Sequence, residues 1–219
     1  IAVAGRRRPP SSAPSFGPAA LGRDVFSRVV VASRVSLQVG FVSVGIAVAV
    51  GVPIGLLAGY YGGTVDAGLM RAMDILFSFP AILLAIAILA VLGPGITSAM
   101  IAIGIVYTPI FARITRGSVL SIKQQVFIRA ARSLAETDSR ILRTHVLPNV
   151  IAPITVQTSL SLAFAILSEA ALSFLGLGVQ PPDPAWGRML AEGRGFFADA
   201  PWMAIFPGLA ILLTVLAFN

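Results

Sequence analysis

Long uncharged stretches alternate with short polar segments along this chain. No charged residue occurs at positions 35–65 or at positions 75–112. A helix needs about 20 apolar residues to cross a bilayer, so the first stretch supplies one membrane span. The second stretch is too long for one helix, and Gly93-Pro94-Gly95 predicts a turn inside it. Together the two stretches predict spans at 36–59, 75–92 and 97–114.

Two later apolar runs predict further spans at 148–175 and 203–219, which brings the visible count to five. Residues 1–35 are expected to form a connector, and the stretch from Gly5 to Gly22, which is rich in Pro and Ser, is expected to be irregular. Proline inside two of the spans predicts kinks at Pro80 and Pro109. Small residues allow close helix packing in lipid, which is expected at Gly40, Gly45, Gly51 and Gly55.

Composition supports a membrane protein. Hydrophobic residues make up 57% of the 219 residues and charged residues only 11%, against about 25% in a soluble domain. Cysteine is absent and His145 is the one histidine, which excludes disulfides, thiolate metal sites and multi-histidine sites. The net charge of +7 does not favour nucleic-acid binding, because no stacking aromatics lie between the basic residues. We expect an all-α integral membrane protein, a polytopic helical bundle.

The basic residues indicate which side of the membrane each segment faces. Counting Lys and Arg leaves the two sides equal, so the positive-inside rule alone does not orient the chain. The segment 113–147 holds seven basic residues close to two membrane ends, which places it in the cytoplasm. Residues 1–35 are then extracytoplasmic, an arrangement that predicts a further span before Ile1. The chain also stops within an apolar run at Asn219, so both ends are expected to be incomplete.

The polar segment 115–147 has the pattern of an amphipathic helix. Apolar residues recur every three or four positions, which predicts one helix over 119–135. Thr137 or Asp138 is expected to cap a second short helix. One interpretation is an amphipathic loop that lies on the membrane surface. The other is a docking helix, in which small alanines let a partner approach and Leu134 anchors it. The apolar stripe consists of Val119, Ile122, Val126, Ala130 and Leu134.

This segment resembles the EAA loop of ABC importer permeases, whose usual pattern is Glu-Ala-Ala-x3-Gly-x9-Ile-x-Leu-Pro. The spacing is intact, with Arg129 at the usual Glu, Ala135 at the usual Gly and His145 at the usual Ile. If that Gly adopts the left-handed backbone conformation, alanine at position 135 lowers stability by about 1 kcal/mol or more. The resemblance implies that contact with an ATPase is made by Ile128, Arg129, Ala130, Ala131, Leu134, Ala135, Glu136, Leu147 and Pro148.

The resemblance extends from about Leu21 to Asn219. It is carried by Gly59-Tyr-Tyr-Gly-Gly63, by Met73-Asp-Ile-Leu-Phe-Ser-Phe-Pro80 and by the sequence from Glu169 to Pro182. These motifs resemble the C-type subunit of the dipeptide/oligopeptide/nickel branch of ABC importer permeases. Members of that branch usually have six spans with both ends cytoplasmic, which implies that the missing span precedes Ile1.

The resemblance implies a division of labour among several chains. A permease of this kind pairs with a sister permease in the bacterial cytoplasmic membrane, above one or two cytoplasmic ABC ATPase subunits. An extracytoplasmic binding protein delivers the cargo. ATP and Mg²⁺ are then bound by the ATPases, and this chain, which has no Gly-x4-Gly-Lys-Ser/Thr loop, is expected to bind no cofactor and to be no enzyme. Peptides are the expected cargo, with nickel chelates, other metal complexes or haem as alternatives.

Other candidate residues lie in or beside the spans. Glu169 is an acid well inside an apolar run, which points either to the substrate path or to a bonded structural role. Aromatic residues expected to line the path are Phe77, Phe79 and Tyr107. Asp183 and Trp186 are expected at the outer interface, where the binding protein docks. Arg113 and Arg116 are interpreted as interface anchors.

Functions from other classes explain less of the sequence. A membrane-embedded hydrolase needs a nucleophile with a base or a metal pair, and His145 lies in the polar segment without a buried serine partner. A secondary transporter or channel often shows inverted repeats or chains of intramembrane charges, and neither occurs here. Ion-driven uptake without ATP would favour that alternative. A scaffold role explains the hydrophobicity but leaves the segment 115–147 without a purpose.

Overall fold

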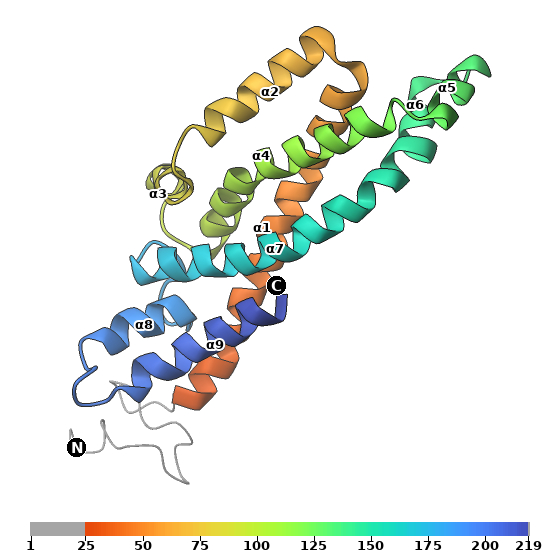
Figure 1. The fold of residues 1–219 in the computed structure, drawn as a ribbon. Helices are drawn as coiled ribbons and strands as arrows, with labels where there is room; N and C mark the ends of the chain where they lie inside the picture. The colour runs from red at the N-terminus through yellow and green to blue at the C-terminus, as the bar shows by residue number, and fades with distance from the viewer. Residues whose placement is uncertain (1–24, 219) are drawn as a thin grey trace. The chain divides into compact units, whose positions relative to one another are not determined.

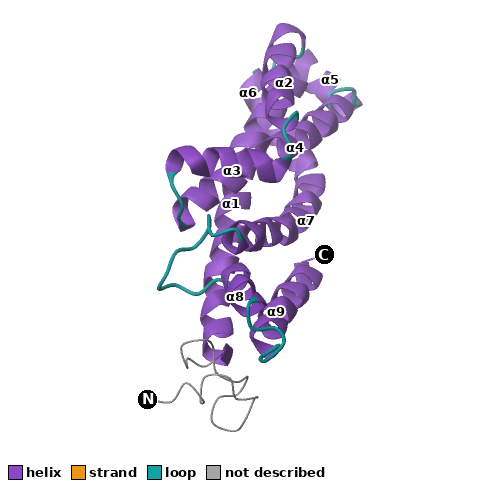
Figure 2. Ribbon diagram, turned by 90° about the vertical axis from the view of Figure 1, so that its left-hand side faces the viewer, coloured by secondary structure: helices purple, strands orange, loops and turns teal. Residues whose placement is uncertain are grey.

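The computed structural model describes residues 25–218, which form helices joined by short loops and contain no strand (Figure 2). The all-α fold class is confirmed. The irregular stretch expected over Gly5–Gly22 lies outside the described residues, as does Asn219. The elements are α1 (Val25–Tyr61), α2 (Gly63–Phe77), α3 (Ala81–Leu92), α4 (Ile96–Ile122), α5 (Val126–Ser133), α6 (Asp138–Arg140), the π-helical stretch η2 (Ile141–Val146), α7 (Leu147–Phe174), α8 (Trp186–Arg194) and α9 (Trp202–Phe218).

The chain divides into two compact units. In its described part, unit 1 contains residues 25–43, 85–103 and 162–218, and unit 2 contains Val44–Leu84 and Gly104–Ser161. The division falls inside four helices, α1, α3, α4 and α7. Each unit therefore combines segments that are far apart in the sequence.

Unit 1 is built where α8 and α9 lie side by side against the first turns of α1 (Figure 1). Its core joins residues from α1, α7, α8 and α9, and Trp186 is the largest of them. Side chains buried in this way stabilise the packing through many van der Waals contacts. The buried residues are Val25, Ala32, Ile166, Ala170, Trp186, Met189, Ala200, Met203 and Ile211.

Unit 2 is held together by a close approach of α1 to α4. A Cβ added at Gly51 would lie 2.6 Å from the Thr108 carbonyl oxygen, and one at Gly59 would lie 2.8 Å from the Val119 Cβ. Gly55, between them, faces Ala112 and Thr115 in the same way. The predicted packing role of Gly51 and Gly55 is confirmed, because glycine at every fourth position lets two helix backbones touch. Gly45 has open space around its Cβ position among the described residues.

Three described helices are long and apolar enough to cross a membrane: α1, α4 and the continuous run Asp138–Phe174. The pair α2 and α3 passes the same test only together, and residues 78–80 interrupt it. The apolar helix α9 has 17 residues. Spans expected at 148–175 and 203–219 correspond closely to α7 and α9, whereas the count of five spans stays a prediction.

The structure differs from the expected boundaries at the N-terminal side of two spans. Helix α1 begins at Val25 and not at the expected span start of residue 36, because Arg28 and Arg34 interrupt the uncharged run without breaking the helix. Residues 63–74 form most of α2 instead of a loop. Pro80 lies at the break between α2 and α3, where the pair bends by 90°, so the bend predicted at this proline is present. The turn predicted at Gly93-Pro94-Gly95 is present, with positive φ at Gly93 and Gly95.

Candidate functional site

The segment with the EAA-like pattern forms two helices rather than one. Helix α4 ends at Ile122, a turn follows at 123–125, and α5 covers Val126–Ser133. The prediction of a single helix over 119–135 is therefore wrong. The spacing of apolar residues persists across the break, so the pattern alone could not reveal it. The break also changes which residues face inward.

Helix α5 buries one face and leaves apolar residues on the other. Ile128 and Ala131 are buried, so these two members of the expected contact set face the protein's own interior. By contrast, 70% of Val126 and 77% of Leu134 are exposed, and Phe127 is also exposed. Exposed apolar residues on a short charged helix indicate a surface that a partner can cover. Other exposed residues of the expected set are Arg129, Ala130, Ala135 and Pro148.

Ala135 ends α5 in a left-handed conformation. Its φ of 54° makes it the one non-glycine residue with positive φ among residues 25–218. The Ala135 N–H donates to the Arg132 carbonyl (3.0 Å), and the Glu136 N–H donates to the Ala131 carbonyl (3.1 Å). This hydrogen-bond pair is the Schellman motif, in which glycine is the usual left-handed residue. The sequence-based expectation of strain at Ala135 is confirmed in its conformation.

The chain after α5 returns to the membrane helices without a break. Thr137 precedes α6 as its N-cap residue, and the helix then runs through η2 into α7. A π-helical turn before Pro148 accommodates a residue that has no N–H group to donate. Glu136 lies 3.2 Å from the His145 Nε2, and Leu147 is half-buried. His145 therefore joins the end of α5 to the start of α7, in a role that its position in the pattern did not suggest.

Charged residues of α2 and α4 line a hollow of about 450 Å³ within unit 2. Arg116 donates to both oxygens of Asp66 (2.5 and 2.6 Å), and Arg113 donates to Asp74 (2.6 Å). Asp66 and Asp74 both lie on α2. The two arginines interpreted as interface anchors are thus paired with carboxylates on α2. Sequence spacing gave no signal of these pairs, because 39 and 50 residues separate their members.

The aromatic residues expected in a substrate path occupy different environments. The Phe77 ring lies 4.1 Å from the Arg113 guanidinium carbon in a cation–π contact. Phe77 and Phe79 are both exposed, whereas Tyr107 is half-buried in α4. These placements leave the path assignment a prediction.

Glu169 is fully buried within unit 1 (0% exposed). Its carboxylate accepts hydrogen bonds from the Ser36 hydroxyl (3.1 Å) and from the Ser173 hydroxyl (2.6 Å). The Ser173 oxygen in turn accepts a hydrogen bond from the Val179 N–H (3.2 Å). Buried polar groups need such partners, and Glu169 finds them on α1 and α7. Of the two roles expected for Glu169, this geometry favours a structural role over a place in the substrate path.

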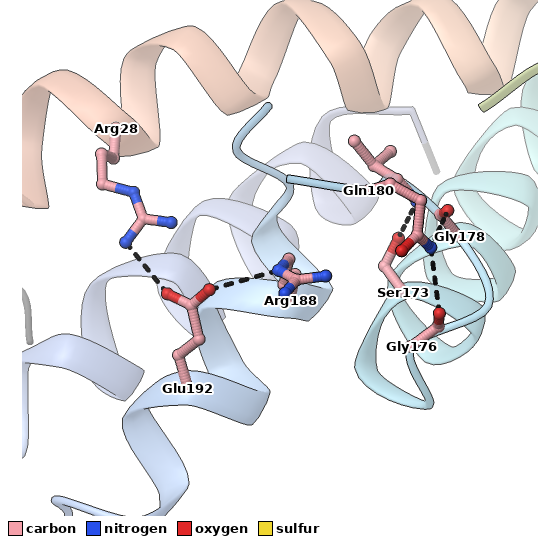
Figure 3. Close-up of polar contacts among 8 residues, drawn as sticks. Arg28, Ser173, Gly176, Gly178, Gln180, Arg188 and Glu192 are labelled. Atoms are coloured by element: carbon pink, nitrogen blue, oxygen red, sulfur yellow. Dashed lines mark hydrogen bonds and ion pairs between the residues drawn. The ribbon is translucent and has the colours of Figure 1, made fainter. Parts of the chain in front are cut away.

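Asp183, in the loop after α7, is exposed at the surface, whereas Trp186, the first residue of α8, is not. Asp183 is exposed, whereas Trp186 is 2% exposed and donates from Nε1 to the Val29 carbonyl (3.0 Å). The expectation that Trp186 docks the binding protein is corrected, because its ring is part of the unit 1 core. The Gln180 side chain folds back to the Gly176 and Gly178 carbonyls, both at 3.0 Å (Figure 3).

An ion-pair triad holds α8 to α1 in unit 1. Glu192 accepts from Arg28 (3.0 Å) and from Arg188 (3.2 Å), as Figure 3 shows. The Arg28 side chain is largely buried in this pair. Among residues 25–218, no group of three or more His, Asp or Glu side chains is arranged to hold a metal ion. The triad connects α8 to α1 through charge-assisted hydrogen bonds.

The chain is similar to known transport proteins over most of its length. Residues 51–219 match the family described as binding-protein-dependent transport system inner membrane component. The chain is 50% identical to the dipeptide transport system permease protein DppC of Alkalihalophilus pseudofirmus, over 98% of this chain and 70% of the relative. It is 49% identical to the glutathione transport system permease protein GsiD of Pectobacterium atrosepticum, over 96% of this chain and 70% of the relative.

Solved structures with the same fold are more distant in sequence. The MetNI methionine ABC transporter in an inward-facing conformation matches with a TM-score of 0.72 and 18% identity, over 88% of this chain and 92% of that one. An amino acid ABC transporter matches with a TM-score of 0.67 and 18% identity, over 88% and 90%. Taken with the curated relatives, the chain belongs to the binding-protein-dependent transport system inner membrane components: it is a non-catalytic ABC importer permease related to DppC, and its ATPase is a separate subunit.

Proposed function

We propose that this chain is one of two permease subunits in an ATP-driven importer of short peptides. The relatives it resembles are named for dipeptide and glutathione transport, and glutathione is itself a tripeptide. Dipeptides and glutathione are both short peptides, which favours a peptide cargo over nickel chelates, other metal complexes or haem. Labelled dipeptide uptake by the assembled transporter, against competing glutathione and nickel, identifies the cargo.

The proposed partners follow from the family. A sister permease completes the path, one or two ABC ATPases bind ATP and Mg²⁺ on the cytoplasmic side, and an extracytoplasmic binding protein delivers the peptide. We place the complex in the bacterial cytoplasmic membrane with α5 in the cytoplasm. Asp183, exposed beside the anchored Gln180 loop, is proposed to lie where the binding protein docks.

The outward face of α5 is the observation that carries the coupling proposal. Val126, Phe127 and Leu134 expose apolar surface on a helix that also presents Arg129 and the small Ala130. Short amphipathic helices of this kind dock into grooves through a few apolar anchors. Ile128 and Ala131 fix the opposite face to the permease, so that α5 joins its own chain on one side and a partner on the other.

The proposed mechanism is alternating access driven from the ATPases. ATP binding draws the two ATPases together, α5 is displaced with them, and the spans change from inward-facing to outward-facing. Such transitions proceed by rigid-body movement at interfaces. Phe77, Phe79 and Tyr107 stay candidates for the peptide path, while the serine partners of Glu169 support a structural role for that residue.

The variant Leu134→Asp tests the coupling proposal. An unpaired carboxylate in an apolar contact costs about 2 kcal/mol or more, so peptide uptake is expected to fall by about tenfold or more. ATP hydrolysis by the bound or released ATPases is expected to persist. The measurement is uptake and hydrolysis by the complete transporter in proteoliposomes. Ser139→Asp, which adds the same charge at an exposed position of α6, is the control. Undiminished uptake by Leu134→Asp would rule out docking through this face.

A further inference from the structure

The end of α1 carries a buried tyrosine with contacts to three other elements of unit 2. Tyr60 is 3% exposed. Its hydroxyl donates to Asp138 Oδ1 (2.6 Å), and its backbone carbonyl accepts from Lys123 Nζ (2.6 Å). The guanidinium carbon of Arg132 lies 5.4 Å from the centre of its ring. Tyr60 belongs to the Gly59-Tyr-Tyr-Gly-Gly63 motif, whose two final glycines form the left-handed turn into α2.

The partners of Tyr60 come from the elements that surround the proposed docking helix. Arg132 lies on α5 itself, and Asp138 begins α6 directly after the Ala135 turn. Lys123 follows the last residue of α4. One side chain and its own carbonyl therefore connect α1 to α4, α5 and α6. Hydrogen bonds to charged groups are stronger and more directional than neutral ones, so these contacts constrain the positions of the elements that they join.

Below this junction, α1 and α4 form a closely packed pair. The backbone approach at Gly51, Gly55 and Gly59 leaves no room for side chains between the two helices. Packed interiors deform little, and a displacement of one helix end is passed along the pair rather than absorbed. A force applied at Tyr60 would thus act on both membrane helices.

We propose that Tyr60 is a positioning residue that passes displacement of α5 and α6 to α1 and α4. This inference rests on the proposed function, in which an ATPase moves α5. The Tyr60–Asp138 bond is the specific link, because Tyr60→Phe removes it and leaves the ring, the Arg132 contact and the Lys123 contact in place. Tyr60 acts through other residues and touches neither nucleotide nor cargo.

The chain contains no cysteine, so single cysteines can carry a fluorophore that responds to its surroundings. One label is placed on α5 at Ser133→Cys and one on α1 at Val50→Cys, both exposed positions of unit 2. The measurement is the fluorescence change of each label when a non-hydrolysable ATP analogue and Mg²⁺ are added to the complete transporter. It requires no knowledge of the cargo.

In the otherwise unchanged transporter, both labels are expected to respond. In Tyr60→Phe the α5 label is expected to keep its response, while the α1 response falls about fivefold. Asp138→Ala is expected to reproduce this loss, whereas Asp138→Asn keeps an acceptor oxygen and retains most of the response. Tyr61→Phe, which removes the hydroxyl of the neighbouring exposed tyrosine, is the matched control and is expected to change nothing.

Equal α1 responses in Tyr60→Phe and in the unchanged transporter would overturn the inference. If Tyr60→Phe fails to assemble, the inference is tested by comparing Asp138→Ala with Asp138→Asn. Equal α1 responses in those two variants would also overturn the inference. If the fluorescence of the α5 label does not change when the nucleotide is added to the unchanged transporter, the proposed function is contradicted instead. Failure of the inference and failure of the proposed function are therefore distinguishable. A purely structural Tyr60 would lower thermal stability and leave the ratio of the two label responses unchanged.

Discussion

Helices α5 and α8 are both short, both lie in polar segments between apolar helices, and both were expected to meet partner proteins. They use their apolar residues in opposite ways. Helix α5 exposes Val126 and Leu134, whereas α8 buries Trp186 and Met189 against α9 and α1. An apolar residue in a polar segment therefore indicates a contact but does not say whether the contact lies within the chain.

The difference follows from what each helix has beside it. In α8, Gly187 has no side chain, and its Cα packs directly on the Ala170 backbone of α7. In α5, Ile128 and Ala131 face inward, while Val126 and Leu134 stay largely exposed among the described residues. The comparison predicts that α8 variants change folding and that α5 variants change coupling.

The largest expected effect is that of Trp186→Ala. Truncating a fully buried tryptophan should lower the free energy of unfolding by about 3–5 kcal/mol, because it leaves a cavity and removes the hydrogen bond from Trp186 Nε1 to the Val29 carbonyl. Leu134→Ala, at the exposed end of α5, should change it by about 0.5 kcal/mol or less. Denaturant unfolding of the detergent-solubilised protein measures both. Similar losses of unfolding free energy in the two variants would contradict the conclusion that α8 is buried in the core while the outer face of α5 is not.

A smaller loss is expected for Glu192→Ala. This change removes the carboxylate from Arg28, whose side chain is 13% exposed, and from Arg188. We expect the free energy of unfolding to fall by about 1–2 kcal/mol, since the partly exposed triad is screened by water. Arg188→Ala leaves the Arg28–Glu192 pair intact and should lower the free energy of unfolding by less than Glu192→Ala does. If the order of these two losses were reversed, Arg28 would not be the residue that ties α8 to α1.

The smallest effect is a gain, expected for Ala135→Gly. Glycine adopts the left-handed conformation of this position without strain, so the free energy of unfolding should rise by about 1 kcal/mol. Ala130→Gly, at an exposed position inside α5, serves as the control and should lower it by about 1 kcal/mol. The same unfolding measurement applies, and a loss in both variants would contradict the strain assigned to Ala135.

The apolar runs predicted the fold class and several elements well. Helices α7 and α9 begin and end within one residue of two expected spans, and the Gly93 turn and the left-handed Ala135 lie where they were expected. The start of α1 at Val25 was missed because Arg34 ends the uncharged run, and the more distant Arg28 is accommodated in the helix by a partner 164 residues away. The break at 123–125 was missed because hydrophobic spacing survives a turn of this length.

Helical structure, embedding in a membrane and similarity to importer permeases can all be derived from the sequence, because apolar run length and motif spacing are local properties. The fold was needed to show that Trp186 is a core residue, that Glu169 is bonded by two serines, and that Tyr60 joins four elements. Each of these contacts pairs residues that are distant along the chain. Their energies depend on which helix faces are brought together, and no local pattern specifies that choice.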